Sequence, residues 1–289
     1  MIFFAAGEAF RSGTHKAMIL EYLRIKGIEH MKVEYYGHTR SVSQFGSAIS
    51  SIIAIFIVFH SKSYRPIFLL SMIPYVLGLL LMLSYPKYLD GVLKETKDGF
   101  QNSIKNKFQY TWSAFIALFR TKEALKAIFN SSTFDGFFKS SKDYLQPILK
   151  AQTLALPVLL YFTAKQRTAI IVGIIYFILY LLTSTASRKS GNFVNRMRSL
   201  PFAVNITFIT GGILLLISGI STSLKLYVVA IIALILLYVV QNLRRPMNVA
   251  YISDNISHRA MASGLSVESQ IKTILMAILA PIIGYLADT

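Results

Sequence analysis

A short run of ionisable residues near the start of the chain has the types and spacing to do chemistry. The segment GEAFRSGTHKAM, residues 7–18, holds Glu8, Arg11 and His15 at helical spacing, so they share one face of a helix. Such a face could bind a charged solute or relay protons, because imidazole titrates near neutral pH. The alternative is a structural Glu8–Arg11 ion pair between helices, with His15 at the edge of the apolar segment.

Other polar residues also interrupt apolar segments, where an ionisable group costs roughly 2.5–3.5 kcal/mol unless it is paired or hydrated. Lys150, Gln152 and Asn205 are candidates for lining the path of a solute or ion. A lysine that reaches the membrane interface explains Lys150 equally well, and an inter-helix hydrogen bond explains Asn205. Charged residues near segment ends are candidates for gating or for the interface: His15, Arg244, Arg245, Arg259 and Glu268. For Glu268 the simple expectation is a salt bridge with Lys272, four residues later.

Composition limits the chemistry that these residues can serve. Of the 289 residues, 54% are hydrophobic and only 15% are charged, whereas soluble domains carry roughly 25% charged residues. The chain has no cysteine, which excludes disulfides and thiolate metal sites. It also lacks an HExxH motif, a phosphate-binding GxxxxGK[ST] loop and paired carboxylates at span depth. We therefore expect no enzyme activity, no metal and no cofactor.

The elements that position the candidates are long apolar runs. Each is close to the ~20 residues that a helix needs to cross a bilayer, and continuous apolar runs indicate helices rather than barrel strands. The predicted class is an all-α, polytopic helical membrane protein with about eight transmembrane helices. The predicted spans are 1–20 (the least apolar), 44–60, 66–85, 145–163, 168–186, 201–220, 224–242 and 266–286.

The basic residues predict the orientation of these spans. Four alternate loops, 21–46, 86–142, 187–199 and 243–264, carry 21 Lys and Arg, whereas the loops between them carry 5. Positive loops face the cytoplasm. Most of the net charge of +17 therefore sets the orientation of the spans and faces the anionic inner leaflet. We expect a multi-pass protein of the cell's inner membrane whose partner is the lipid bilayer and not nucleic acid.

The spacing of the spans predicts three regions. Residues 1–85 hold three spans, 86–142 form a basic cytoplasmic linker, and 143–289 hold five spans. Within the linker, Trp112, Phe115, Ile116 and Phe119 recur at helical spacing. They favour an amphipathic helix on the membrane surface, and an ordinary solvated linker helix is the alternative.

Several of these stretches resemble the major facilitator superfamily of transporters. GEAFRSGTHKAM is similar to the fourth helix of that family, and KDYLQPIL at 142–149 to the start of its seventh. SRKSGNFVNRMR resembles the loop between helices 8 and 9. The clearest likeness is RRPMNVAYISDNISHRAMASGLSVESQIKTILMAILAPIIGYLAD, which resembles the loop after helix 10 and helix 11 with its P-x-x-G-x-x-A-D close.

The resemblance implies that the eight spans correspond to helices 4 to 11 of a twelve-helix fold built from two bundles. Helices 1 to 3 and helix 12 have no counterpart, so we expect a partial gene product. The implied function is secondary active transport of a small solute by alternating access, coupled to protons, with Glu8 as the candidate coupling carboxylate. The alternative is a non-transporting fragment or an accessory membrane subunit.

Overall fold

The computed structural model describes residues 14–86, 116, 121–155, 157–256 and 261–288. Regular structure within these ranges is helical, which confirms the predicted all-α class. The helices are α2 (Thr14–Ile25), η1 (Glu29–Met31), α3 (Lys32–Ser61), α4 (Arg65–Leu70), α5 (Met72–Leu83), α7 (Lys122–Lys142), α8 (Leu145–Ala155), α9 (Ala164–Arg188), α10 (Ser190–Asn195), α11 (Leu200–Ser223), α12 (Tyr227–Asn255) and α13 (Met261–Asp288).

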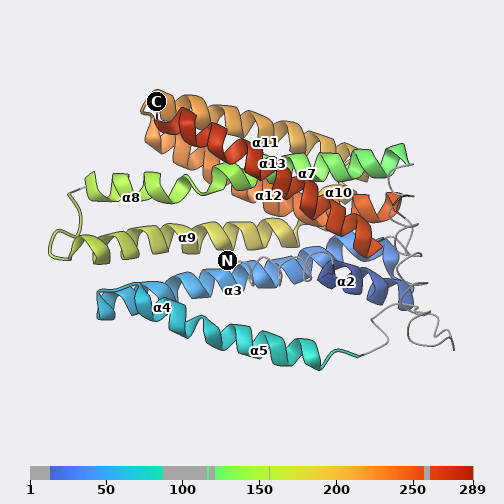
Figure 1. The fold of residues 1–289 in the computed structure, drawn as a ribbon, viewed down its shortest axis with the longest axis horizontal. Helices are drawn as coiled ribbons and strands as arrows, with labels where there is room; N and C mark the ends of the chain where they lie inside the picture. The colour runs from blue at the N-terminus through green and yellow to red at the C-terminus, as the bar shows by residue number, and fades with distance from the viewer. Residues whose placement is uncertain (1–13, 87–115, 117–120, 156, 257–260, 289) are drawn as a thin grey trace.

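The long helices lie side by side along the longest axis of the molecule (Figure 1). α3 packs along α9, α11 along α12, and α7 along α13, while α12 also contacts α3, α7 and α9 and so occupies the centre. Six helical stretches of the described residues are long and apolar enough to cross a membrane. They are Glu29–Ser61, Arg65–Leu83, Ala164–Arg188, Leu200–Ser223, Tyr227–Asn255 and Ser263–Tyr285.

Two of these helices reach well into segments that we expected to be loops. α3 begins at Lys32 rather than near residue 44, and α12 continues to Asn255 rather than ending near 242. Polar residues that suggested loops instead pair between helices. Arg40 Nε of α3, for example, donates to Oδ1 of the buried Asn242 of α12 at 3.3 Å. Paired polar side chains are compatible with the interior of a helical membrane bundle.

The structure also differs from the expected linker, because residues 122–142 form α7 and pack against α12 and α13. Hydrogen bonds from the Tyr144 amide to the Ser141 carbonyl and from the Ile148 amide to the Tyr144 carbonyl, both 3.2 Å, lead directly into α8. α8 therefore follows α7 end to end along the bundle (Figure 1). α8 ends at Ala155, short of the expected limit at residue 163. Three of the four aromatic and aliphatic residues of the expected surface helix, 112, 115 and 119, lie outside the described residues.

A glycine sets the close approach of α3 to α9. A Cβ added to Gly37 would lie 2.5 Å from both the Ser187 carbonyl oxygen and the Ser190 hydroxyl oxygen. One turn further along α3, the hydroxyls of Ser41 and Ser184 lie 2.9 Å apart. Small residues at such positions let two backbones approach, which is how helices associate in lipid.

Pro246 interrupts the hydrogen-bond ladder in the middle of α12. Proline has no amide hydrogen, so the carbonyl four residues earlier, that of Asn242, loses its helical donor. The Ser187 hydroxyl of α9 donates to this carbonyl at 3.0 Å, and Ser187 is fully buried. A side chain from a neighbouring helix thus satisfies the carbonyl that the proline leaves free.

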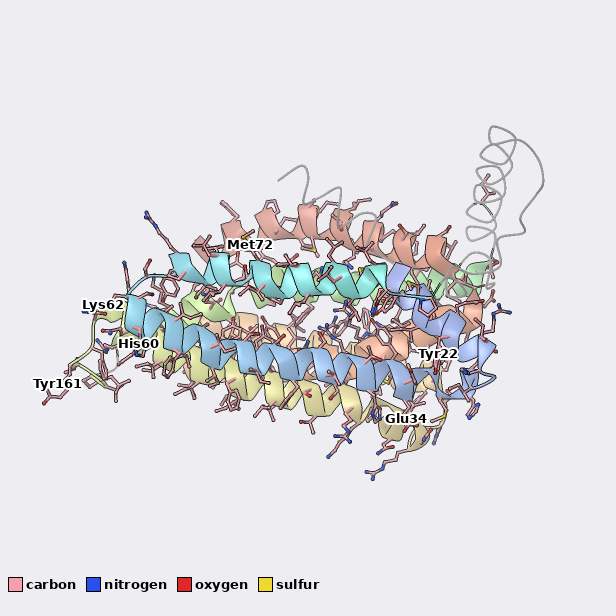
Figure 2. All side chains as sticks on the ribbon, turned by 90° about the horizontal axis from the view of Figure 1, so that it is seen from below. Tyr22, Glu34, His60, Lys62, Met72 and Tyr161 are labelled. Carbon is pink, nitrogen blue, oxygen red and sulfur yellow. The ribbon has the colours of Figure 1, made fainter. Side chains whose placement is uncertain are left out.

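The outer surface of the bundle is apolar, as a lipid-facing surface requires. Figure 2 shows His60, Lys62 and Tyr161 at one end of the bundle and Tyr22 and Glu34 at the other. Along the sides between the ends, large apolar side chains are exposed on every long helix. The Arg65–Leu83 stretch is the extreme case, because none of its most apolar window is buried.

Candidate functional site

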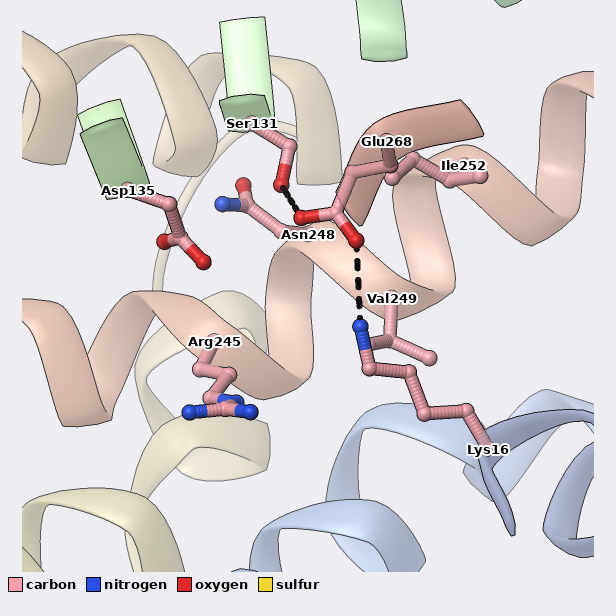
Figure 3. Close-up of a pocket in the computed structure, with 8 residues that line it drawn as sticks. All are labelled: Lys16, Ser131, Asp135, Arg245, Asn248, Val249, Ile252 and Glu268. Carbon is pink, nitrogen blue, oxygen red and sulfur yellow. Dashed lines mark hydrogen bonds and ion pairs between the residues drawn. The ribbon is translucent and has the colours of Figure 1, made fainter. Parts of the chain in front are cut away.

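A small polar cavity lies between α2, α7, α12 and α13 (Figure 3). Four of its lining side chains are charged: Lys16, Asp135, Arg245 and Glu268. Ser131 and Asn248 add polar groups. The cavity offers about 10 Å³ to the centre of a water-sized sphere, which is room for about one water molecule. In this conformation the cavity is therefore too small to hold a solute.

Glu268 is the most completely enclosed charge of the cavity, with 2% of its surface exposed. Its carboxylate lies 3.1 Å from Lys16 Nζ and accepts a hydrogen bond from the Ser131 hydroxyl at 3.0 Å (Figure 3). The neighbouring Ser132 hydroxyl donates to the Glu268 backbone carbonyl at 2.9 Å, and Lys272 adds a further electrostatic attraction. A buried carboxylate is tolerated in a membrane bundle when it has partners of this kind.

Asp135 is the second buried acid, with 5% of its surface exposed. The Gln241 amide donates to its carboxylate at 2.5 Å. Arg245, on the next turn of α12, interacts electrostatically with both Asp135 and Glu268. In the part of the chain that the structure describes, however, no acidic oxygen lies within the 4.0 Å of an ion pair from the Arg245 guanidinium.

Arg244 is adjacent in sequence but serves a different environment. It is fully buried, and its guanidinium donates to the Val204 carbonyl, to the Thr207 hydroxyl at 3.2 Å and to Asn130. It also lies over two aromatic rings, at 4.6 Å from the Phe134 centroid and 5.2 Å from that of Phe208. Hydrogen bonds and cation–π contacts together compensate its burial, so Arg244 fastens α12 to α7 and α11.

Among the described residues, two ion pairs join the first group of helices, α2 to α5, to the second, α7 to α13. One is Lys16–Glu268 at the cavity, and the other is the close pair between Lys32, at the start of α3, and Asp254, at the end of α12. Both lie at the end of the bundle that the basic residues predict to be cytoplasmic. The cavity therefore sits where the two groups of helices meet.

The structure brings only some of the predicted site residues to this cavity. Arg245 and Glu268 line it, while Arg244 is buried beside it. Glu268 forms its ion pair with Lys16 of α2, and the salt bridge with Lys272 that the spacing suggested is not formed among the described residues; Lys272 adds only an electrostatic attraction. Glu8, Arg11 and Arg259 lie outside the described residues.

The remaining predicted residues lie away from the cavity lining. Lys150 is exposed and Gln152 half-buried on α8. Asn205 is exposed on α11 and accepts a hydrogen bond from the Asn130 amide at 3.4 Å, the inter-helix contact that was its alternative explanation. His15 is exposed at the start of α2.

Sequence reasoning missed Asp135, Ser131 and Asn248, because their segments were assigned to loops. A signal was present in residues 127–138, AIFNSSTFDGFF, where Asp135 is the one charged residue among apolar and small residues. Small and hydroxyl residues at helical spacing are typical of helix–helix interfaces in membranes. That pattern, more than mean hydropathy, identifies α7 as part of the bundle.

The described helices thus form a bundle with six stretches of membrane-crossing length and a charged cavity between two groups of helices. The chain matches the model of the Major Facilitator Superfamily over residues 32–268. It belongs to that superfamily, which confirms the resemblance seen in the sequence. Comparisons with curated proteins and with solved structures gave no match. Family membership supports a multi-pass membrane protein that transports solutes and is not an enzyme.

Proposed function

We propose that the chain carries out secondary active transport of a small solute by alternating access, with protons as the coupling ion. The observation that carries this proposal is the polar cavity of Lys16, Asp135, Arg245 and Glu268, enclosed between the two groups of helices. Buried ionisable groups are costly in a membrane and mark solute and proton pathways. In transporters built from two bundles, alternating access is a rocking of one bundle against the other around the binding site.

The ion pairs at one end of the bundle support the alternating-access part of the proposal. Lys16–Glu268 and Lys32–Asp254 hold the two groups of helices together there, and the cavity has room for about one water. A solute reaches the cavity only when the helices separate and at least the Lys16–Glu268 pair opens. The conformation described here is thus one closed state of the cycle.

Carboxylates at the cavity support the proton-coupled part. The Glu268 carboxylate lies 3.1 Å from Lys16 Nζ and accepts a hydrogen bond from the Ser131 hydroxyl at 3.0 Å. Opening the Lys16 pair removes its nearest positive charge, which favours proton uptake by a buried carboxylate. Glu268 and Asp135 are therefore candidates for the coupling group beside Glu8, which the sequence nominated.

Reconstituted protein tests this function directly. The full chain is placed in liposomes that contain a pH-sensitive dye, and pools of amino acids, sugars and organic acids are added outside under an imposed pH gradient. We expect one pool to move protons together with solute. Glu268→Gln should abolish the proton movement, while Glu123→Gln, an exposed acid at the start of α7, serves as the matched control. Solute movement without any proton movement would remove the coupling claim.

An accessory membrane subunit is the second candidate, favoured by the Arg65–Leu83 stretch. Its apolar residues are exposed, and α5 packs mainly against α4 among the described helices. Such a surface is available for another polypeptide as well as for lipid. If no pool is transported by the chain alone, but transport appears when it is co-reconstituted with a membrane partner, the accessory function replaces the transporter proposal.

A further inference from the structure

We propose that the transported solute is an anion, and that Arg245 binds its carboxylate or phosphate group. This inference rests on the proposed transport function and concerns the same cavity. It derives from three observations: the balance of charge around the cavity, the lack of an ion-pair partner for Arg245 among the described residues, and the side-chain oxygen of Asn248, which is buried without a hydrogen-bond partner among them.

The charge balance around the cavity is strongly positive. Two acids, Asp135 and Glu268, lie at the cavity. The basic side chains that line it or interact electrostatically with its charges are Lys16, Arg40, Lys139, Arg244, Arg245 and Lys272. Six cations against two anions leave an excess of four positive charges among the described residues. For side chains buried in the bundle such an excess is unfavourable unless an anion enters.

The two acids are already engaged. Glu268 is bound by Lys16 and Ser131, and Asp135 accepts from Gln241. Arg245 is attracted by both acids, but among the described residues it forms an ion pair with neither, and its side-chain hydrogen-bond partner is the Tyr36 hydroxyl, which is not an acid. A guanidinium presents a planar fork of donors that matches a carboxylate or a phosphate with two parallel hydrogen bonds. Arg245 is thus the cation best placed to receive an anionic group.

Asn248 provides a second contact one turn from Arg245 on the same helix. Its side-chain oxygen is buried and has no hydrogen-bond partner within the described part of the protein, although it lines the cavity (Figure 3). Leaving a buried acceptor unpaired is costly. A hydroxyl group on the solute would supply the missing donor. The site therefore fits a small hydroxylated or protonated anion better than a fully deprotonated, donor-free one.

Binding to the detergent-purified full chain tests the inference without requiring transport. Thermal unfolding is followed with inorganic phosphate, glycerol 3-phosphate, lactate or succinate, and with glucose and choline as neutral and cationic comparisons, all at equal ionic strength. We expect at least one of the anions to raise the unfolding temperature in a saturable way. Arg245→Gln should raise the apparent Kd of that anion about tenfold or more.

The matched control is Arg188→Gln, which removes the same charge from an exposed position at the end of α9. This variant should bind the anion as the unmodified protein does. Equal weakening in both variants would indicate a general charge effect and would overturn the site. No stabilisation by any anion, or saturable stabilisation by glucose or choline that survives Arg245→Gln, would overturn the anion class.

Uptake of the stabilising anion into liposomes separates the two proposals. Uptake that Arg245→Gln abolishes supports both. Binding that depends on Arg245 without any uptake leaves the anion site standing and removes the transport function. Uptake of a neutral or cationic solute that is unchanged in Arg245→Gln leaves transport standing and removes the anion site. A phosphate-bearing and a carboxylate-bearing probe are both included, so the preferred group is identified in the same series.

Discussion

Replacing Ser187 by alanine should destabilise the bundle through a carbonyl that lies on another helix. The Ser187 hydroxyl donates at 3.0 Å to the Asn242 carbonyl, which Pro246 deprives of its helical donor. Ser187 is fully buried, so water cannot take over as donor. Hydrogen bonds between membrane helices average about 0.6 kcal/mol and reach about 1.7 kcal/mol, and an unpaired buried acceptor adds to the loss. We expect Ser187→Ala to lower the free energy of unfolding by about 1 kcal/mol.

A double-mutant cycle isolates this cause. In Pro246→Ala, residue 246 regains an amide hydrogen and can donate to the Asn242 carbonyl, so Ser187 is no longer its one donor. The cost of Ser187→Ala should then fall to a few tenths of a kcal/mol. Unfolding is measured by circular dichroism as the mole fraction of SDS rises in mixed micelles. Thr185→Ala is the control on the same helix, because its exposed hydroxyl bonds only the Leu181 carbonyl of its own helix.

An equal cost of Ser187→Ala with and without Pro246 would refute the reasoning. It would mean that the loss arises from packing of the side chain, not from the carbonyl that the proline exposes. A cost for Thr185→Ala as large as that for Ser187→Ala would refute it in another way. The loss of any hydroxyl group on α9 would then be enough to explain the destabilisation, without the Asn242 carbonyl.

Two further predictions concern packing and topology. Gly211→Ala should destabilise the protein by about 1–3 kcal/mol, because the added Cβ would lie 2.2 Å from the Phe134 ring. The control Gly212→Ala meets open space and should be neutral or stabilising in the same SDS assay. Equal effects of the two substitutions would contradict the close approach of Gly211 to Phe134. The chain has no cysteine, so a single introduced cysteine can be labelled selectively. Lys62→Cys should react with an impermeant maleimide on intact cells, and Arg188→Cys only after permeabilisation, because the basic loops are predicted to face the cytoplasm. The reverse pattern would overturn that orientation.

Hydropathy predicted the helices that are apolar along most of their length, but it did not predict helices that bury polar residues. The central parts of α3, α9 and α11 were predicted because lipid-facing residues dominate them. α7 was missed because its interior polar groups, Ser131, Ser132 and Asp135, are paired by residues distant in sequence. Such pairs depend on the tertiary arrangement: the small and hydroxyl residues of 127–138 indicate a helix interface, but they do not identify the partners. The same limit applies to the Lys16–Glu268 pair, whose members are 252 positions apart.

The two adjacent arginines of α12 show most clearly why residue type alone does not define the site. Successive residues of a helix point about 100° apart, so Arg244 and Arg245 face different neighbours. Arg244 is held by backbone and side-chain acceptors and by two rings, and its charge is committed to structure. Arg245 faces the cavity without an ion-pair partner among the described residues, and its charge is available to a ligand. Pro246, the next residue, leaves the Asn242 carbonyl without its helical donor, and the Ser187 hydroxyl of α9 donates to that carbonyl at 3.0 Å. The Ser187–Asn242 hydrogen bond thus joins α9 to the same part of α12 that carries Arg245 at the cavity.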